Sequence, residues 1–193
     1  MPLISPASND AVARRRNDGS YSMGVAGAAF DSTVSIARPD NTTNYTAGDV
    51  IGVAKSGTPA DAGSAIHTLS NAGPSGGFVL IQSVSLVVGL SVVTSGMGGF
   101  RVHFYNASPT AILDNAAYNL VSDDVSAYMG FVDLAAPQDL GSTLYTQADY
   151  LGKLIKLAAA STSLYAQIET RNGFTPASGA TYELRVNALE AGL

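Results

Sequence analysis

The segment 98–106, with the sequence GGFRVHFYN, constrains the fold of this chain more than any other stretch. Phe100, Val102 and Phe104 alternate with more polar side chains. A period of two is that of a β-strand, whose successive side chains point to opposite faces of a sheet. The same alternation recurs in the segment 181–189, with the sequence TYELRVNAL. Both segments are therefore predicted to be strands with one buried face.

Similar patterns recur from residue 33 onward, separated by turns rich in Gly, Pro, Asn and Asp. The remaining predicted strands are 33–38, 49–54, 66–70, 77–88, 127–134, 152–158 and 162–170, with 90–94 as a continuation of 77–88 through a bend at Gly89. Only 13% of the residues are charged, about half the usual ~25% share, so the chain lacks the Glu and Lys faces of long helices. The sequence predicts an all-β fold: an antiparallel two-sheet sandwich, with a jelly roll as the most specific choice.

Only two segments could form helices. The first is 107–120, with the sequence ASPTAILDNAAYNL, where Thr110 could cap a short helix. The second is a turn within 144–150, with the sequence LYTQADY. Any helix is thus expected to be short and to lie outside the sandwich core.

The first thirty residues differ in composition from the rest of the chain. They combine small residues with three successive arginines and show no sustained period, which predicts an extended N-terminal arm over 1–30 and a β-sandwich domain over 31–193. They lack the apolar region of a secretory signal, and the apolar run 78–93 is broken by Gln82, serines and Gly89. We therefore expect a soluble protein with no membrane partner.

Charge limits the choice of partners. The net charge of −5 argues against nucleic-acid binding by the body of the protein. Arg14, Arg15 and Arg16 are the exception, and they have two interpretations: a solvated arm, or a docking arm that pairs with carboxylates on a neighbouring subunit. We favour docking, and rank binding of packaged nucleic acid lower because the arm would have to lie inside a shell.

No catalytic constellation is evident in the sequence. His67 and His103 are the only histidines, and His103 is expected to be a sheet-face or interface residue because it lies in the middle of a strand. The glycine-rich segments 73–77 and 95–100 precede strands, whereas phosphate loops open helices. Asp123 and Asp124 are adjacent, so their side chains diverge. We expect no enzymatic activity.

Metal and cofactor sites are also not expected. There are no cysteines, which excludes disulfides and thiolate metal sites. Asp40, Asn41 and Asp49 could supply oxygen ligands to Ca²⁺, but they lack the spacing of an EF-hand. Capping of turns by these side chains is the favoured interpretation. The sequence therefore predicts neither a cofactor nor a metal.

The stretch IARPDNTTNYTAGDVIG, which ends at Gly52, is followed by the segment 80–120, by DLGSTLY at 139–145 and by GFTPASGATYELRVNAL from Gly173. These segments resemble a group of tailed-bacteriophage structural proteins that carry R-P-x-x-T-x-x-Y-x-x-G-D-V-[VI]-G, F-R-[VL]-H-[FL]-Y-N-x-[SA]-P and D-L-G-S-T-L-Y motifs. The resemblance covers about residues 33–190 and leaves the arm outside it.

Such proteins resemble capsid decoration (cement) proteins. The resemblance implies binding of the major capsid protein on the outer surface of the head, bridging of neighbouring capsomers, synthesis in the host cytoplasm and a final place in the virion. We expect self-association as well, with a homotrimer preferred and a dimer second. The alternative is a carbohydrate- or receptor-binding module of a head or tail fibre, because jelly rolls also form lectins.

Arg38 and Tyr45 are the candidate binding residues of this first motif. Tyr45 could serve as an aromatic anchor for a partner, and Arg38 could bind beside it. Equally, both could pack on their own domain and lock the loop that leads through Gly48 and Asp49 into the next strand. The sequence leaves these two interpretations open.

Overall fold

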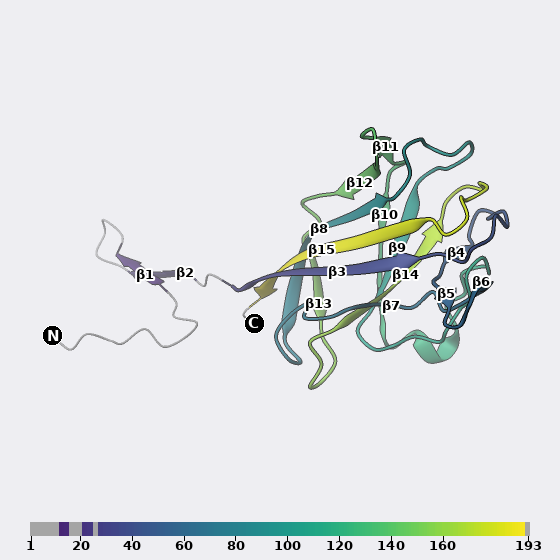
Figure 1. Cartoon of the computed structure of the whole chain (residues 1–193). Helices are drawn as coiled ribbons and strands as arrows, with labels where there is room; N and C mark the ends of the chain where they lie inside the picture. The colour runs from purple at the N-terminus through teal and green to yellow at the C-terminus, as the bar shows by residue number, and fades with distance from the viewer. Residues whose placement is uncertain (1–11, 16–20, 25–26, 192–193) are drawn as a thin grey trace.

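The computed structural model describes residues 12–15, 21–24 and 27–191 of the chain. Two antiparallel sheets face each other (Figure 1). Sheet 1 contains, in spatial order, β11 (Gln138–Asp139), β12 (Leu144–Ala148), β8 (Phe78–Val88), β15 (Thr181–Ala191) and β3 (Ala29–Ala37), with β13 (Lys153–Lys156) also paired to β8. Sheet 2 contains β10 (Tyr128–Leu134), β9 (Phe100–Tyr105), β14 (Leu164–Thr170) and β4 (Val50–Ile51), with β7 (His67–Leu69) also paired to β14.

The strand order is that of a jelly roll. Sheet 1 runs β3-β15-β8-β12, sheet 2 runs β4-β14-β9-β10, and the chain passes from one sheet to the other after β3, β4/β7, β8, β10, β13 and β14. β12 and β13 pair with successive parts of β8 and together occupy one strand position. Eight strand positions in two antiparallel sheets with these crossings define the fold, so the predicted sandwich and jelly roll are confirmed.

The core lies between the sheets and follows the predicted alternation. Phe100, Val102 and Phe104 of β9 are fully buried there. Tyr182 and Leu184 of β15 meet them from sheet 1, with the rings of Tyr182 and Phe100 edge to face at 6.4 Å. Period-two patterning therefore identified both the strands and the faces that they bury.

Two smaller hairpins accompany the sandwich. β1 (Val12–Arg15) pairs with β2 (Tyr21–Gly24), and β5 (Ala54–Lys55) pairs with β6 (Thr58–Ala62). β3 begins at Ala29, at the boundary expected between arm and body, while residues 1–11 and 16–20 of the predicted arm lie outside the described residues. The division into an arm and a body stays a prediction.

The helix predictions were wrong. Within the described ranges, the 3₁₀ turn Ser122–Asp124 is the single helical element, and no helix there is long and apolar enough to cross a membrane. The segment 107–120 instead forms an irregular connection with a turn at Asp114 and Asn115, and Leu113 bridges to Ser64 and Ala117 bridges to Asp49. The segment 144–150 mostly forms β12, because pairing with β8 overrides its local turn preference.

The expected continuation of β8 is also absent. The strand ends at Val88, and the backbone N–H of Gly89 donates to the carbonyl oxygen of Thr181 at 2.8 Å. Residues 90–94 then leave the sheet as a connection to β9. Gly89 was predicted to bend the strand, but β8 ends immediately before Gly89.

The open edge of the sandwich, where β10 of sheet 2 lies near β12 and β13 of sheet 1, is irregular. The pairing of β10 with β9 shifts register between Tyr128 and Phe131, at a bulge that contains Gly130 with φ of +83°. Residues 149–152 interrupt the other side, where Tyr150 and Gly152 have φ of +56° and +57°. Neither edge strand therefore offers a long regular ladder.

Candidate functional site

The first candidate site is a buried polar cluster built from the motif that begins at Arg38. Its guanidinium donates from Nε to the Tyr45 hydroxyl at 2.8 Å and from Nη2 to Oδ2 of Asp114 at 3.3 Å. The Tyr45 hydroxyl donates to Oδ1 of Asp114 at 2.6 Å. Since the side chains of Arg38 and Asp114 are 0% and 2% exposed, this is an ion pair enclosed by the domain. We call these three residues the lock.

The lock joins four separate parts of the chain. Nη1 of Arg38 also donates to the carbonyl oxygens of Asn41 and Ala177, at 3.0 and 3.2 Å. Oδ1 of Asp114 accepts a second hydrogen bond from the backbone N–H of Gly52 at 2.8 Å. Every strongly polar group of the cluster thus has a partner, as buried charges require.

Aromatic packing completes the cluster. The Tyr45 ring lies 5.2 Å from the Phe174 ring, and the Arg38 guanidinium lies over the Tyr45 ring at 5.0 Å. Burial, followed by the charge of Asp114, raises the pKa of Tyr45 well above its ordinary value. The hydroxyl therefore keeps its proton and remains a donor to Asp114 throughout the ordinary pH range.

The loop after Tyr45 is fixed by turn chemistry. Oδ2 of Asp49 accepts hydrogen bonds from the backbone N–H and the hydroxyl of Thr46, and Gly48 between them has φ of +96°. Oδ1 of Asn41 accepts from the backbone N–H of Thr43. These contacts match the predicted capping roles, and among the described residues no group of three or more His, Cys, Asp or Glu side chains could hold a metal ion.

The structure brings together two of the five predicted binding residues and adds one that the sequence did not reveal. Arg38 and Tyr45 are 1% and 2% exposed, so the contacts they make are those of the internal lock. Asp114, 76 residues after Arg38, was missed because no local pattern links the two. Arg14 and Arg15 lie in β1, and Arg16 lies outside the described residues.

A second polar cluster covers the outer face of sheet 2 around His103. Its Nε2 lies 2.8 Å from Oε2 of Glu169, its Nδ1 lies 3.0 Å from the Tyr128 hydroxyl, and its ring stacks on Tyr118 at 3.7 Å. In the neutral ring Nε2–H donates to the carboxylate and Nδ1 accepts from the phenol. Burial lowers the pKa of His103, which favours this neutral form.

This cluster offers little for catalysis. Both ring nitrogens of His103 are engaged, so neither is free to activate a nucleophile. Its other members form ordinary surface pairs: Arg101 holds Asp133 through two hydrogen bonds of 2.7 and 2.9 Å, and its guanidinium lies 3.7 Å from the Phe131 ring centre. The hydrogen bond from Arg101 lowers the pKa of Asp133. The predicted sheet-face role of His103 agrees with this position.

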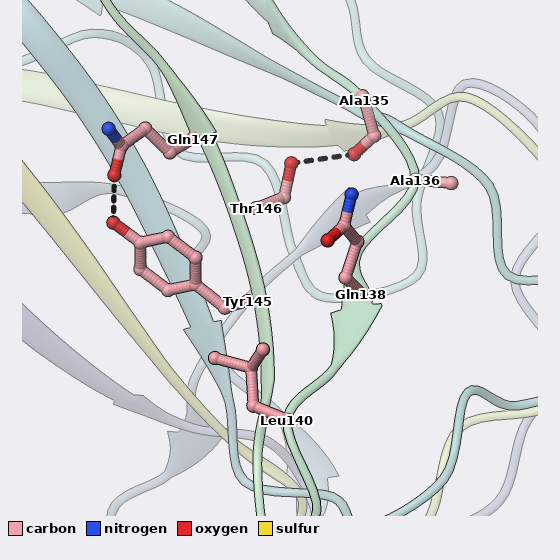
Figure 2. Close-up of a pocket in the computed structure, with 7 residues that line it drawn as sticks. All are labelled: Ala135, Ala136, Gln138, Leu140, Tyr145, Thr146 and Gln147. Atoms are coloured by element: carbon pink, nitrogen blue, oxygen red, sulfur yellow. Dashed lines mark hydrogen bonds between the residues drawn. The ribbon is translucent and has the colours of Figure 1, made fainter.

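Two hollows lie along the open edge of the sandwich. One, of about 240 Å³, lies between the segment after β10 and β12 (Figure 2). In it the Thr146 hydroxyl donates to the carbonyl oxygen of Ala135 at 2.8 Å, and Tyr145 contacts Gln147. Its lining is Ala135, Ala136, Gln138, Leu140, Tyr145, Thr146 and Gln147. Only the Tyr145 phenol among these can titrate, so the hollow suits packing better than chemistry.

The second hollow, of about 430 Å³, contains Lys153. It is lined by Phe131, Val132 and Asp133 of β10 together with Leu151 and Lys153. Burial lowers the pKa of Lys153, and a Cβ at Gly130 would lie 2.8 Å from its Nζ. Gly130 therefore leaves room for the lysine to cross the edge between the two sheets.

The outer face of sheet 1 is different, because it is almost free of charge. Its outward positions alternate with core residues along β3, β8, β12 and β15. The outward residues are mainly Thr33, Ser35, Ala37, Leu80, Ser85, Val87, Tyr145, Gln147, Thr181, Asn187 and Leu189. The charged residues of this face are Asp31, the neighbouring pair Glu183 and Arg185, and Lys156 of β13, which pairs with Phe78. A face with many Ser, Thr, Asn, Gln and Tyr side chains is suited to contact with another protein.

Comparisons with known proteins give only distant likenesses. No family model and no curated protein matches the sequence. Among solved structures, the chain is similar to the capsid of Ralstonia phage GP4, with 11% identity over 99% of this chain and 93% of that chain and a TM-score of 0.40. It is also similar to the capsid asymmetric unit of cyanophage Pam1, with 18% identity over 97% and 100% and a TM-score of 0.36, and to Cocksfoot mottle virus, with 11% identity over 86% and 96% and a TM-score of 0.29. TM-scores below 0.5 carry no conclusion about the role of this chain.

Proposed function

We propose that this chain is a bacteriophage decoration (cement) protein, which binds the major capsid protein on the outside of the head and bridges neighbouring capsomers. The observation that carries the proposal is the outer face of sheet 1, where Ser, Thr, Asn and Gln outnumber charged side chains. Few charged side chains keep this face soluble, so the exposed face favours association. Contact with a partner protein would remove the face from water.

The lock supports the same role. The motif that most resembles the phage structural proteins holds loops of the jelly roll together through Arg38, Tyr45 and Asp114. These hydrogen bonds hold the loops in one arrangement, and the buried residues of the lock are not available to a partner, so a partner would contact the outer surfaces. A rigid body loses little conformational freedom on docking, so more of the interface energy remains as affinity.

Bridging stabilises a shell by mass action. A subunit that binds only the intact lattice shifts the equilibrium toward that lattice, and many copies multiply a contribution of a few kcal/mol each. Particles without this protein should therefore assemble but break at lower temperature or under osmotic shock. Purified protein should restore resistance in proportion to its occupancy.

Introducing negative charges at two places on the surface tests the proposed face. Thr33→Glu with Ser35→Glu places two carboxylates on the outer face of sheet 1, and Thr58→Glu with Ala60→Glu places two on exposed β6 as a matched control. Cosedimentation with undecorated particles should fall at least tenfold for the first pair and stay near that of the unmodified protein for the second. Equal binding by both variants would remove this face from the interface.

A different result would favour the receptor-binding alternative. Particles that lack the protein, resist heat and osmotic shock normally and yet fail to adsorb to cells would contradict the cement role. Glycan-array screening of the purified protein would then identify the ligand.

A further inference from the structure

Three leucines form a continuous row on the outer face of sheet 1. Strand register pairs Leu189 of β15 with Leu80 of β8, and Leu80 with Leu154 of β13. Paired residues in an antiparallel sheet share a face, and the neighbours of Leu80, Val79 and Ile81, point into the core. Leu154 and Leu189 are 48% and 40% exposed. We call Leu80, Leu154 and Leu189 the leucine row.

The leucine row lies beside Phe78 and Lys156, and most other positions of this face are polar. Adjacent large apolar side chains on a soluble domain commonly indicate a site of interaction. The row continues through Ala29, which pairs with Leu189 and is the first residue of β3. The row therefore lies where the N-terminal segment joins the body.

The β1–β2 hairpin lacks a sheet to complete it. Among the described residues the two strands pair with each other and with no strand of the two large sheets (Figure 1). A two-stranded hairpin alone is marginally stable in water, whereas packing on an apolar surface stabilises it. The hairpin thus needs a surface of the kind that the leucine row provides.

The connection between hairpin and body is short. The carbonyl oxygen of Ala28 accepts a hydrogen bond from the backbone N–H of Glu190 at 2.8 Å, so the chain still lies along β15 at that point. A Cβ at Gly27 would lie 2.2 Å from the carbonyl oxygen of Glu190. The three peptide links from Gly24 to Gly27 can span at most about 10 Å, which limits how far the hairpin can fold back.

Charge also matches the hairpin to the row. Residues 12–24 contain three arginines and one aspartate, while residues 29–193 carry a net charge of −6. Asp31 lies on the outer face of sheet 1, two residues along β3 from Ala29, and makes no ion pair with the other residues in 27–191. A basic hairpin placed over the row would meet this carboxylate.

We propose that the β1–β2 hairpin of one copy docks on the leucine row of the next copy. Among the described residues the hairpin pairs with no strand of the body, and the side chains of Leu154 and Leu189 are exposed, so each copy offers both halves of a contact. Such a head-to-tail contact between unlike surfaces closes into a ring when its rotation allows. The inference rests on the proposed function, since it assigns the contact between subunits that lie side by side on the shell.

Disulfide trapping tests the proposal, because the chain has no cysteine of its own. Ser22→Cys in β2 is mixed with a differently tagged Asn187→Cys chain, whose new thiol lies two residues from Leu189 on the same face. Thr181→Cys, exposed on the same face at the other end of β15, is the matched control. The Ser22–Asn187 heterodimer should form at least tenfold more than the Ser22–Thr181 heterodimer, both in concentrated solution and on decorated particles.

A second measurement tests the row itself. Leu154→Ser with Leu189→Ser should abolish the trapped heterodimer and any assembly larger than a monomer, with the β-type circular dichroism spectrum unchanged. Val92→Ser, at a residue 67% exposed in the β8–β9 connection, should change neither. Equal trapping at positions 187 and 181 would overturn the proposal, as would closure of a Ser22→Cys/Asn187→Cys chain on itself in dilute solution.

The two proposals fail in distinguishable ways. If particles bind the Leu154→Ser/Leu189→Ser protein as well as the unmodified protein and show no selective trapping, the hairpin contact is wrong and the cement role stands. If the unmodified protein does not bind particles at all, the cement role is wrong.

Discussion

Replacing Arg38 by Met tests whether the lock holds the domain together. The substitution keeps an unbranched side chain of similar length, but leaves the Asp114 carboxylate, 2% exposed, without its cation. It also leaves the carbonyl oxygens of Asn41 and Ala177 without this donor. Breaking a buried ion pair by removing one partner costs about 3–5 kcal/mol. Because domains of this kind have about 5–15 kcal/mol of stability, the loss should be large.

The expected magnitude can be compared with an exposed pair. Arg185 bonds Glu183 on the surface, where its side chain is 48% exposed, so Arg185→Met should lower the free energy of unfolding by less than about 1 kcal/mol. Urea unfolding at pH 7 measures both variants, with the slope of the transition as a check that only stability has changed. In a thermal scan, Arg38→Met should lower the melting temperature by roughly 10 °C.

A double-mutant cycle then isolates the contact. Asp114→Asn removes the carboxylate, and in combination with Arg38→Met it should cost at least about 1 kcal/mol less than the sum of the two single changes. A loss below about 1 kcal/mol for Arg38→Met, or strict additivity in the cycle, would refute the account of the lock.

Three further predictions concern pH and the arm. Burial lowers the pKa of His67 to about 4, below its value of 6.5 in the unfolded chain, so stability is full above pH 6.5 and falls toward pH 4. Between pH 7.5 and 5, the loss of stability measured by urea unfolding should be about 2 kcal/mol larger for the unmodified protein than for His67→Gln, which keeps the contribution of His103; equal losses in the two proteins would contradict the prediction. Residues 1–30 should be cut by trypsin in the free protein and protected on particles, and equal cleavage in both states would remove the case for docking. Replacing Arg14, Arg15 and Arg16 by Ala should weaken particle binding while the melting temperature changes by less than about 2 °C; unchanged occupancy would make them a solvated face.

The sequence predicted the strands because their chemistry is local. The alternate spacing of Phe100, Val102 and Phe104 alone indicates that one face of their strand is buried. Once the strands are placed along the sequence, the rules for connecting them allow few topologies. The segment 107–120 was expected to allow a helix because Thr110 could cap one, but Asp114 is held by Arg38 and the neighbouring backbone pairs with other loops. Long-range pairing outweighed local preference there.

The candidate sites were harder to predict, because their residues come together only through contacts between distant parts of the chain. Arg38 and Tyr45 stand in one motif and could be selected together, whereas their partner Asp114 lies far along the chain. The leucine row joins three strands through their register, and register is set only when the sheet forms. Nothing in the spacing of Leu80, Leu154 and Leu189 along the sequence marks them as neighbours.

The bulge at Gly130 and the interruption around Tyr150 bear on the tendency of the protein to aggregate. An exposed strand edge can recruit strands of other copies into an insoluble aggregate. This chain has few charges to keep its copies apart, but the edge formed by β10, β12 and β13 is irregular and therefore a poor template for strand addition. At the opposite side of sheet 1, β3 pairs with β15 in unbroken register, so the regular edge that another copy could pair with is the outer edge of β3.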